Sequence, residues 1–117
     1  MSHPGRLEGE TAIITGAGLG LGEGIARKFI EEGCNVLLFE INADNGRKVA
    51  KSLPKKQAEF FEGDVTKLEH WEQALEVCTE YFGGLDIVVN NAGVVHRSAV
   101  SSPSFPPISL VSLSKAE

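Results

Sequence analysis

Cysteine, basic charge and long apolar runs are all scarce in this 117-residue sequence. Its two cysteines, Cys34 and Cys78, show neither zinc-ligand spacing nor a Cys-x-x-Cys pair, so both are expected to be small core residues in a reducing, cytoplasmic setting. A formal net charge of −5 argues against a nucleic-acid or anionic-membrane partner. No apolar run is long enough to cross a bilayer, and residues 1–6 lack the apolar segment of a secretory signal.

What the sequence does contain is a regular alternation of short apolar segments and helical patterns. Strands are predicted at residues 11–15, 35–40, 58–62 and 85–89, and helices at residues 20–32, 42–52 and 66–82. Such alternation predicts the α/β class, with a Rossmann-type parallel sheet in strand order 3-2-1-4 and helices on both faces.

Local signals mark where these helices begin and end. Asn42 or Asp44 is expected to open the second helix, and the Thr-Lys-Leu-Glu sequence at residues 66–69 reads as a capping box for the third. Gly33 and Gly83 are expected to end the first and third helices, because glycine tolerates the left-handed conformation found there.

The alternation stops at Gly93, which divides the chain into two parts. Residues 1–93 are predicted to form a partial NAD(P)-binding Rossmann-like domain, and residues 94–117 a Ser/Pro-rich irregular tail with seven serines and three prolines. The sheet would then be incomplete, with its fourth strand at an edge. An apolar edge strand is open to pairing with another chain, so self-association is expected.

A glycine-rich turn, Thr-Gly-Ala-Gly-Leu-Gly-Leu-Gly at residues 15–22, joins the first strand to the first helix. Missing Cβ atoms allow a pyrophosphate to approach the backbone, and the N–H groups of the first helical turn point at it. Nucleotide-binding and methyl-donor-binding folds share such a turn, so the turn alone does not choose between them.

An acidic residue follows the turn at the spacing that dinucleotide binding requires. Glu40 ends the second strand, where a carboxylate accepts hydrogen bonds from a ribose 2′-hydroxyl and repels a 2′-phosphate. This position favours NAD over NADP. The competing interpretation of Glu40 is a solvent-facing strand end without a ligand.

Three segments in order resemble the short-chain dehydrogenase/reductase family. They are the turn at residues 15–22, the Gly-Asp-Val sequence at residues 63–65 and the Asn-Asn-Ala-Gly sequence at residues 90–93. The resemblance covers residues 5–93 and disfavours the methyl-donor alternative. It implies the cofactor-binding part of an oxidoreductase that transfers a hydride between a nicotinamide and an alcohol or carbonyl substrate.

The resemblance also implies which residues contact the cofactor. The pyrophosphate turn would use Gly16, Leu19, Gly20, Leu21 and Gly22. Glu40 would bind the ribose, and the remaining contacts would surround the adenine and the ribose: Ile41, Asp64, Val65, Asn91, Ala92 and Gly93. Asp64 would bond the adenine amine, although it also suits a helix N-terminal residue near Thr66, and both interpretations can hold together. Asn90 and Asn91 equally suit residues that satisfy backbone groups at a strand end.

The residues for the family's chemistry are not found in this sequence. That chemistry uses a tyrosine as acid and base, with a lysine four residues later that lowers the tyrosine pKa. The only tyrosine, Tyr81, is followed at that distance by Leu85 and is expected on an exposed helix surface. His70 and His96 are expected to be exposed, without catalytic partners. We therefore expect no catalytic residue, no metal site and an inactive, truncated chain.

A second hypothesis comes from a different class of function. In it, the exposed edge of the fourth strand and the Ser/Pro-rich tail bind a partner, such as a related chain, and the protein is a non-catalytic interaction or regulatory module. Co-purification of a stoichiometric partner would separate this hypothesis from the oxidoreductase interpretation.

Overall fold

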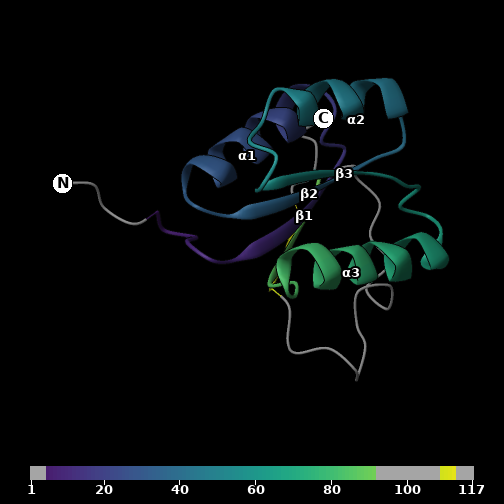
Figure 1. Ribbon diagram of the computed structural model, residues 1–117. Coiled ribbons are helices and arrows are strands. Elements are labelled where there is room, and N and C mark those ends of the chain that lie inside the picture. Colours follow the sequence, from purple (N-terminus) through teal and green to yellow (C-terminus); the bar gives the residue numbers. More distant parts are fainter. Residues whose placement is uncertain (1–4, 92–108, 113–117) are drawn as a thin grey trace.

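A computed structural model describes residues 5–91 and 109–112 of the chain, and its helices enclose a parallel sheet (Figure 1). The strands are β1 (Thr11–Thr15), β2 (Asn35–Glu40), β3 (Ala58–Glu62), β4 (Ile87–Asn90) and β5 (Ser109–Ser112). The helices are α1 (Gly20–Glu31), α2 (Ala43–Lys51) and α3 (Leu68–Phe82). Helices α1 and α2 cover one face of the sheet and α3 covers the other, as the sequence predicts (Figure 1).

The sheet confirms the predicted order of its first four strands and adds a fifth. Its order is β3-β2-β1-β4-β5, and all four pairings are parallel. The strands β1, β2 and β3 add successively toward one edge of the sheet, and β4 then lies on the other side of β1. The carboxyl ends of β1 and β4 therefore form the topological switch point, where such sheets bind ligands.

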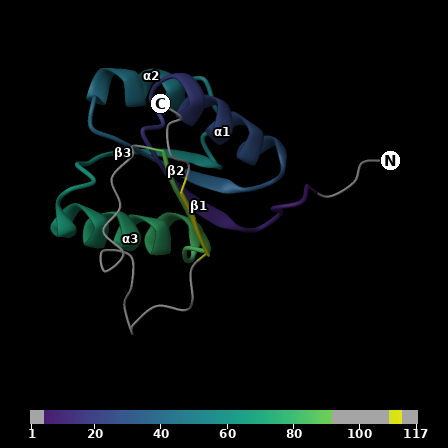
Figure 2. The ribbon, with the colours of Figure 1, turned by 180° about the vertical axis from the view of Figure 1, so that it is seen from behind.

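The fifth strand corrects the expectation that β4 is an edge strand and that the tail is irregular throughout. Residues 109–112 pair with β4 in register, so that Ile87 lies beside Ser109 and Asn90 beside Ser112 (Figure 2). A four-residue Ser-Leu-Val-Ser segment is too short to show a period among serines and prolines, which is why the sequence pattern missed it. The other residues of the tail lie outside the described residues, and the domain boundary at residue 93 stays a prediction.

Two apolar clusters fill the space on either side of the sheet. One lies beneath α1 and α2, and the other beneath α3, where the Phe39 ring stacks on Trp71 with centroids 4.7 Å apart. Cys34 belongs to the first cluster and Cys78 to the second, which confirms both as core residues. Burial raises the pKa of each thiol to about 12, so neither is a ready nucleophile.

Most of the predicted helix ends are confirmed. Asn42 is the N-cap of α2, and its side-chain oxygen accepts a hydrogen bond from the Asn45 N–H at 2.9 Å. Gly33 and Gly83 follow α1 and α3 with φ of 89° at both positions. Within the described residues, no helix is long and apolar enough to cross a membrane.

The capping box at residues 66–69 is wrong. Helix α3 begins at Leu68 after an N-cap, Lys67, whose side chain makes no capping bond. The Thr66 hydroxyl instead donates to Asp64 Oδ1 at 2.7 Å. A charged acceptor two residues upstream therefore competes successfully for the hydroxyl that a capping box would use.

Candidate functional site

The glycine-rich turn follows β1 at the carboxyl edge of the sheet and has the geometry that its sequence predicts. Gly16 and Gly20 adopt φ of 62° and 57°, which side chains with a Cβ rarely tolerate. At Gly22 the constraint is distance, because a Cβ would lie 2.0 Å from the Gly16 carbonyl oxygen. The turn therefore folds directly against the start of α1, and these three glycines are needed for two different reasons.

The start of α1 leaves donors available next to this turn. Its N-cap, Leu19, is extended and makes no side-chain capping bond. Among the described residues, the first N–H groups of the helix therefore have no side-chain acceptor and, with the helix dipole, favour an anion. Leu19 and Leu21 are 65% and 62% exposed, although both are large apolar side chains.

Glu40 faces the turn from the end of β2. One carboxylate oxygen, Oε1, accepts a hydrogen bond from the Gly18 N–H at 2.8 Å, and the other, Oε2, accepts one from the Asn42 N–H at 3.0 Å. A Cβ at position 18 would lie 2.8 Å from Oε1, so only glycine permits this approach. Ile41, the next residue, is 63% exposed.

A hydrogen-bond network joins the turn to β4. The Thr15 hydroxyl accepts from the Asn91 N–H at 2.8 Å and donates to Asn90 Oδ1 at 3.0 Å. The Asn91 side-chain amide donates to the Gly16 carbonyl at 3.3 Å. The interpretation of Asn91 as a residue that satisfies backbone groups is thus confirmed. Its predicted contact with a ribose stays a prediction, while Ala92 and Gly93 lie outside the described residues.

Asp64 lies in the segment between β3 and α3. Its Oδ1 accepts from both the N–H and the hydroxyl of Thr66, at 2.9 and 2.7 Å, and these bonds hold the pKa of the carboxyl below its usual value. The contact with Thr66 is present, but Asp64 is not the N-terminal residue of the helix, because α3 begins at Leu68 after Lys67 as its N-cap. Val65, predicted to pack on the adenine, packs against the cluster beneath α3, and its carbonyl accepts from the Trp71 indole N–H at 2.9 Å.

The prediction that His70 is exposed is wrong, and the contact that it makes was not predicted. His70 is half-buried in the first turn of α3, where its Nδ1 accepts a hydrogen bond from the Asp64 N–H at 2.8 Å. Its spacing from Asp64 is not a known capping pattern, so no sequence signal identified it. Tyr81 lies exposed near the end of α3, as predicted, whereas His96 lies outside the described residues.

Comparison with known proteins identifies the family to which this chain belongs. The profile of the family described as short chain dehydrogenase matches residues 10–106. The chain belongs to the short-chain dehydrogenase family. This membership agrees with the sheet order and with the position of the glycine turn at the switch point.

Several relatives within the short-chain dehydrogenase family are about two fifths identical to the chain. Over 95 residues it is 38% identical to a (+)-cis,cis-nepetalactol synthase from Nepeta racemosa, and over 90 residues 39% identical to zerumbone synthase from Zingiber zerumbet. An NADP-dependent (R)-specific alcohol dehydrogenase from Lentilactobacillus kefiri is 40% identical over 96 residues. These matches cover 76–81% of the chain but span only 34–38% of the relatives' length.

Proposed function

We propose that this chain is the NAD-binding part of a short-chain oxidoreductase and that Glu40 selects NAD over NADP. The family implies an NAD(P) cofactor, which when bound accepts or donates a hydride. The observation that carries the choice of cofactor is the position of the Glu40 carboxylate, which faces the glycine turn and bonds the Gly18 N–H.

The hydrogen bonding of Glu40 suits a ribose diol. A carboxylate offers about four lone-pair sites. Each oxygen of Glu40 uses one site, for Gly18 or for Asn42, so each retains capacity for a hydroxyl donor. Two neighbouring sugar hydroxyls match two neighbouring acceptors, and both N–H bonds hold the carboxylate in place before the ligand arrives.

A 2′-phosphate would meet negative charge at the same place. Glu40 is the register partner of Glu62 on β3, so two acidic residues end adjacent strands. The turn at residues 16–22 contains no lysine or arginine to offset them. Arg27, further along α1, is already paired with Glu23 at 2.6 Å. We therefore expect NADP to bind more weakly than NAD.

The other predicted contacts complete this proposal. Gly16, Gly20 and Gly22 would shape the turn around the pyrophosphate, and Leu19 and Leu21 would lend their backbone N–H groups to it. Ile41 would lie against the adenine, with Asp64 at the adenine amine. The exposure of Ile41, Leu19 and Leu21 supports these roles, because a bound dinucleotide would cover apolar surface that is otherwise open to water.

We also propose that this chain alone does not turn over substrate. The 117-residue sequence contains no Tyr-x-x-x-Lys segment, and Tyr81 lies near the C-terminal end of α3. A tyrosine without a neighbouring cation is a poor base at neutral pH.

Isothermal titration calorimetry of the chain with NAD, NADP and adenosine tests the proposal. We expect NAD to bind more tightly than NADP, with part of the affinity retained by adenosine. Tighter binding of NADP would contradict the role of Glu40. Absence of binding by every ligand, in a sample shown to be folded by circular dichroism, would contradict cofactor binding by this chain. Oxidation or reduction of an alcohol or carbonyl panel at ordinary enzyme rates would contradict the lack of turnover.

A further inference from the structure

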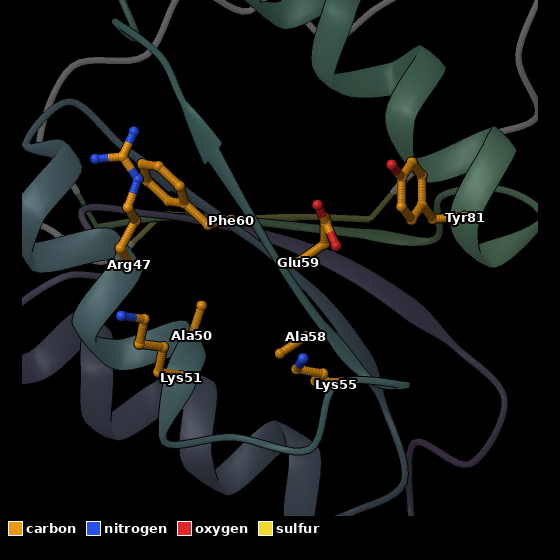
Figure 3. Close-up of a pocket in the computed structure, with 8 residues that line it drawn as sticks. All are labelled: Arg47, Ala50, Lys51, Lys55, Ala58, Glu59, Phe60 and Tyr81. Carbon is orange, nitrogen blue, oxygen red and sulfur yellow. The ribbon is translucent and has the colours of Figure 1, made fainter.

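A groove runs along the open edge of β3, on the side of the sheet remote from β4. It has a volume of about 450 Å³ and is lined by residues of α2, of β3, of α3 and of the loop before β3 (Figure 3). Arg47 and Lys51 come from α2, and Tyr81 comes from α3 on the other side of the strand (Figure 3). The floor of this β3 groove is therefore a strand edge, and its two walls are helices.

Backbone groups of alternate residues point outward along the open edge of β3, which forms the floor of the β3 groove and continues beyond it to Glu62. The Val36 N–H donates to the Gln57 carbonyl, and the Gly63 N–H donates to the Glu40 carbonyl, so residues 57 and 63 face β2. Backbone direction alternates along a strand, which turns residues 58, 60 and 62 away from β2. The Ala58 N–H bonds the Pro54 carbonyl, but within the described residues the N–H groups of Phe60 and Glu62 have no hydrogen-bond partner.

Positive charge gathers on the α2 side of the β3 groove. Arg47, Lys51 and Lys55 line it, all three are exposed, and none forms an ion pair with another described residue. The Arg47 guanidinium lies 5.8 Å from the centroid of the Phe60 ring, which holds that cation over the groove. Glu59 is the only acid among the lining residues, in a chain whose net charge is −5.

On the α3 side, the groove presents the Tyr81 ring and the Glu59 carboxylate instead (Figure 3). Tyr81 is 60% exposed and lines the groove from this side. A strand added to β3 would point alternate side chains toward the α2 wall and toward the α3 wall. It would therefore meet cations at every second position, and the Tyr81 ring and the Glu59 carboxylate at the positions between them.

We infer that the β3 groove binds an extended acidic peptide, which adds to the sheet as a further strand with carboxylates at every second position. Main-chain bonds to Phe60 and Glu62 would supply pairing, while Arg47, Lys51 and Lys55 would select the acidic side chains. A second copy of this chain fits less well, because pairing two β3 edges would bring the cation clusters of both copies together.

The direct test is binding of the full chain to fluorescent nonapeptides, measured by anisotropy without dinucleotide. One peptide alternates glutamate with valine, and its control alternates lysine with valine. We expect the acidic peptide to bind and its affinity to fall at least about tenfold between roughly 0.05 M and 0.5 M salt. Equal binding of both peptides, or no binding of the acidic one, would overturn the inference.

A matched pair of variants locates the site. The double variant Arg47→Glu with Lys51→Glu should weaken the acidic peptide at least about tenfold. The double variant Lys48→Glu with Lys67→Glu makes the same charge change at two exposed positions that do not line the groove, and it should stay within about twofold of the unchanged chain. Equal losses in both variants would mean that only overall charge matters, and the inference would fail.

Backbone pairing needs its own readout. N-methylation of alternate peptide residues blocks one hydrogen-bonding edge, so one methylated register should lose binding while the other keeps it. In ¹⁵N spectra, the acidic peptide should shift the amides of Phe60 and Glu62. Inorganic phosphate that competes fully, or self-association of the chain through these same two amides, would each overturn the assignment to a peptide strand.

Discussion

The Gly18 N–H donates to Glu40 Oε1 at 2.8 Å, which joins the glycine turn to the end of β2. Only glycine at position 18 allows the carboxylate this close, since a Cβ would lie 2.8 Å from that oxygen. The residue that would bind a ribose is thus fixed by the loop that would bind the pyrophosphate. The proposed cofactor preference should therefore be sensitive to substitution of either residue.

Substitution of Glu40 should change the cofactor preference. In Glu40→Ala, the NAD affinity should fall about tenfold to a hundredfold, because hydrogen bonds to a charged group are lost. The NADP affinity should fall less, since the repulsive charge is lost as well. Calorimetry with both dinucleotides measures the ratio. Glu72→Ala is the control, because Glu72 is an exposed acid of α3 that has no part in the proposed site. An equal change in both variants would remove the special role of Glu40.

Two glycines of α1 should respond in opposite ways to the same substitution. Gly22→Ala forces a Cβ against the Gly16 carbonyl and should lower the free energy of unfolding by about 1–3 kcal/mol. Gly24→Ala meets nothing within 4 Å and should raise the free energy by about 0.5–1 kcal/mol. Urea unfolding measures both variants. A tolerated alanine at position 22, with NAD affinity unchanged, would contradict the described turn.

The Asp64 carboxyl predicts a pH dependence of stability. Its pKa is lowered in the folded chain, chiefly by the bonds from Thr66. The charged carboxylate therefore contributes stability above the ordinary aspartate pKa of about 4, and this stability is lost as the pH falls through the lower folded pKa. Thr66→Val removes the hydroxyl donor and leaves the N–H, so the pKa of Asp64 should rise part of the way toward its usual value.

Nuclear magnetic resonance titration of the Asp64 carboxyl carbon measures this change. Thr79→Val provides the control, because the Thr79 hydroxyl bonds the Leu75 carbonyl within α3 and has no contact with Asp64. A titration curve for Asp64 that is identical in the unchanged chain and in Thr66→Val would show that the hydroxyl does not stabilise the charge.

The thiols of Cys34 and Cys78 should be protected in the folded chain. Burial raises the pKa of each to about 12, so the reactive thiolate is rare near neutral pH. We expect iodoacetamide at about pH 8 to leave both thiols unmodified and to alkylate both in denaturant. Mass spectrometry counts the added groups, and Cys34→Ala assigns the signal of Cys78. Rapid alkylation of the native chain would contradict their burial.

The sequence predicted the parts of the fold that rest on local, regularly spaced signals. The glycines of the turn, the strand order and Asn42 as a helix cap all follow from residue type and spacing. The capping box failed because Asp64, an acceptor outside the motif, takes the Thr66 hydroxyl. The fifth strand was missed because four residues carry too little periodicity.

In the candidate sites too, the features with a local sequence signal were predicted, and those that depend on distant residues were not. Glu40 was identified from its distance along the chain, but its bonds to Gly18 and Asn42 depend on how the turn folds back. The β3 groove could not be predicted, because it needs Arg47 and Tyr81, residues of two helices on opposite faces of the sheet. Long-range neighbours of this kind leave no pattern in a single sequence.

The Thr15 hydroxyl, at the end of β1, couples the opening of β4 to that of the glycine turn. Because the same oxygen receives the Asn91 N–H and donates to the Asn90 side chain, β4 cannot separate from β1 at this end while these bonds remain. Fraying of β4 would therefore release the loop at Gly16 in the same event, and hydrogen exchange at both places should report a single opening.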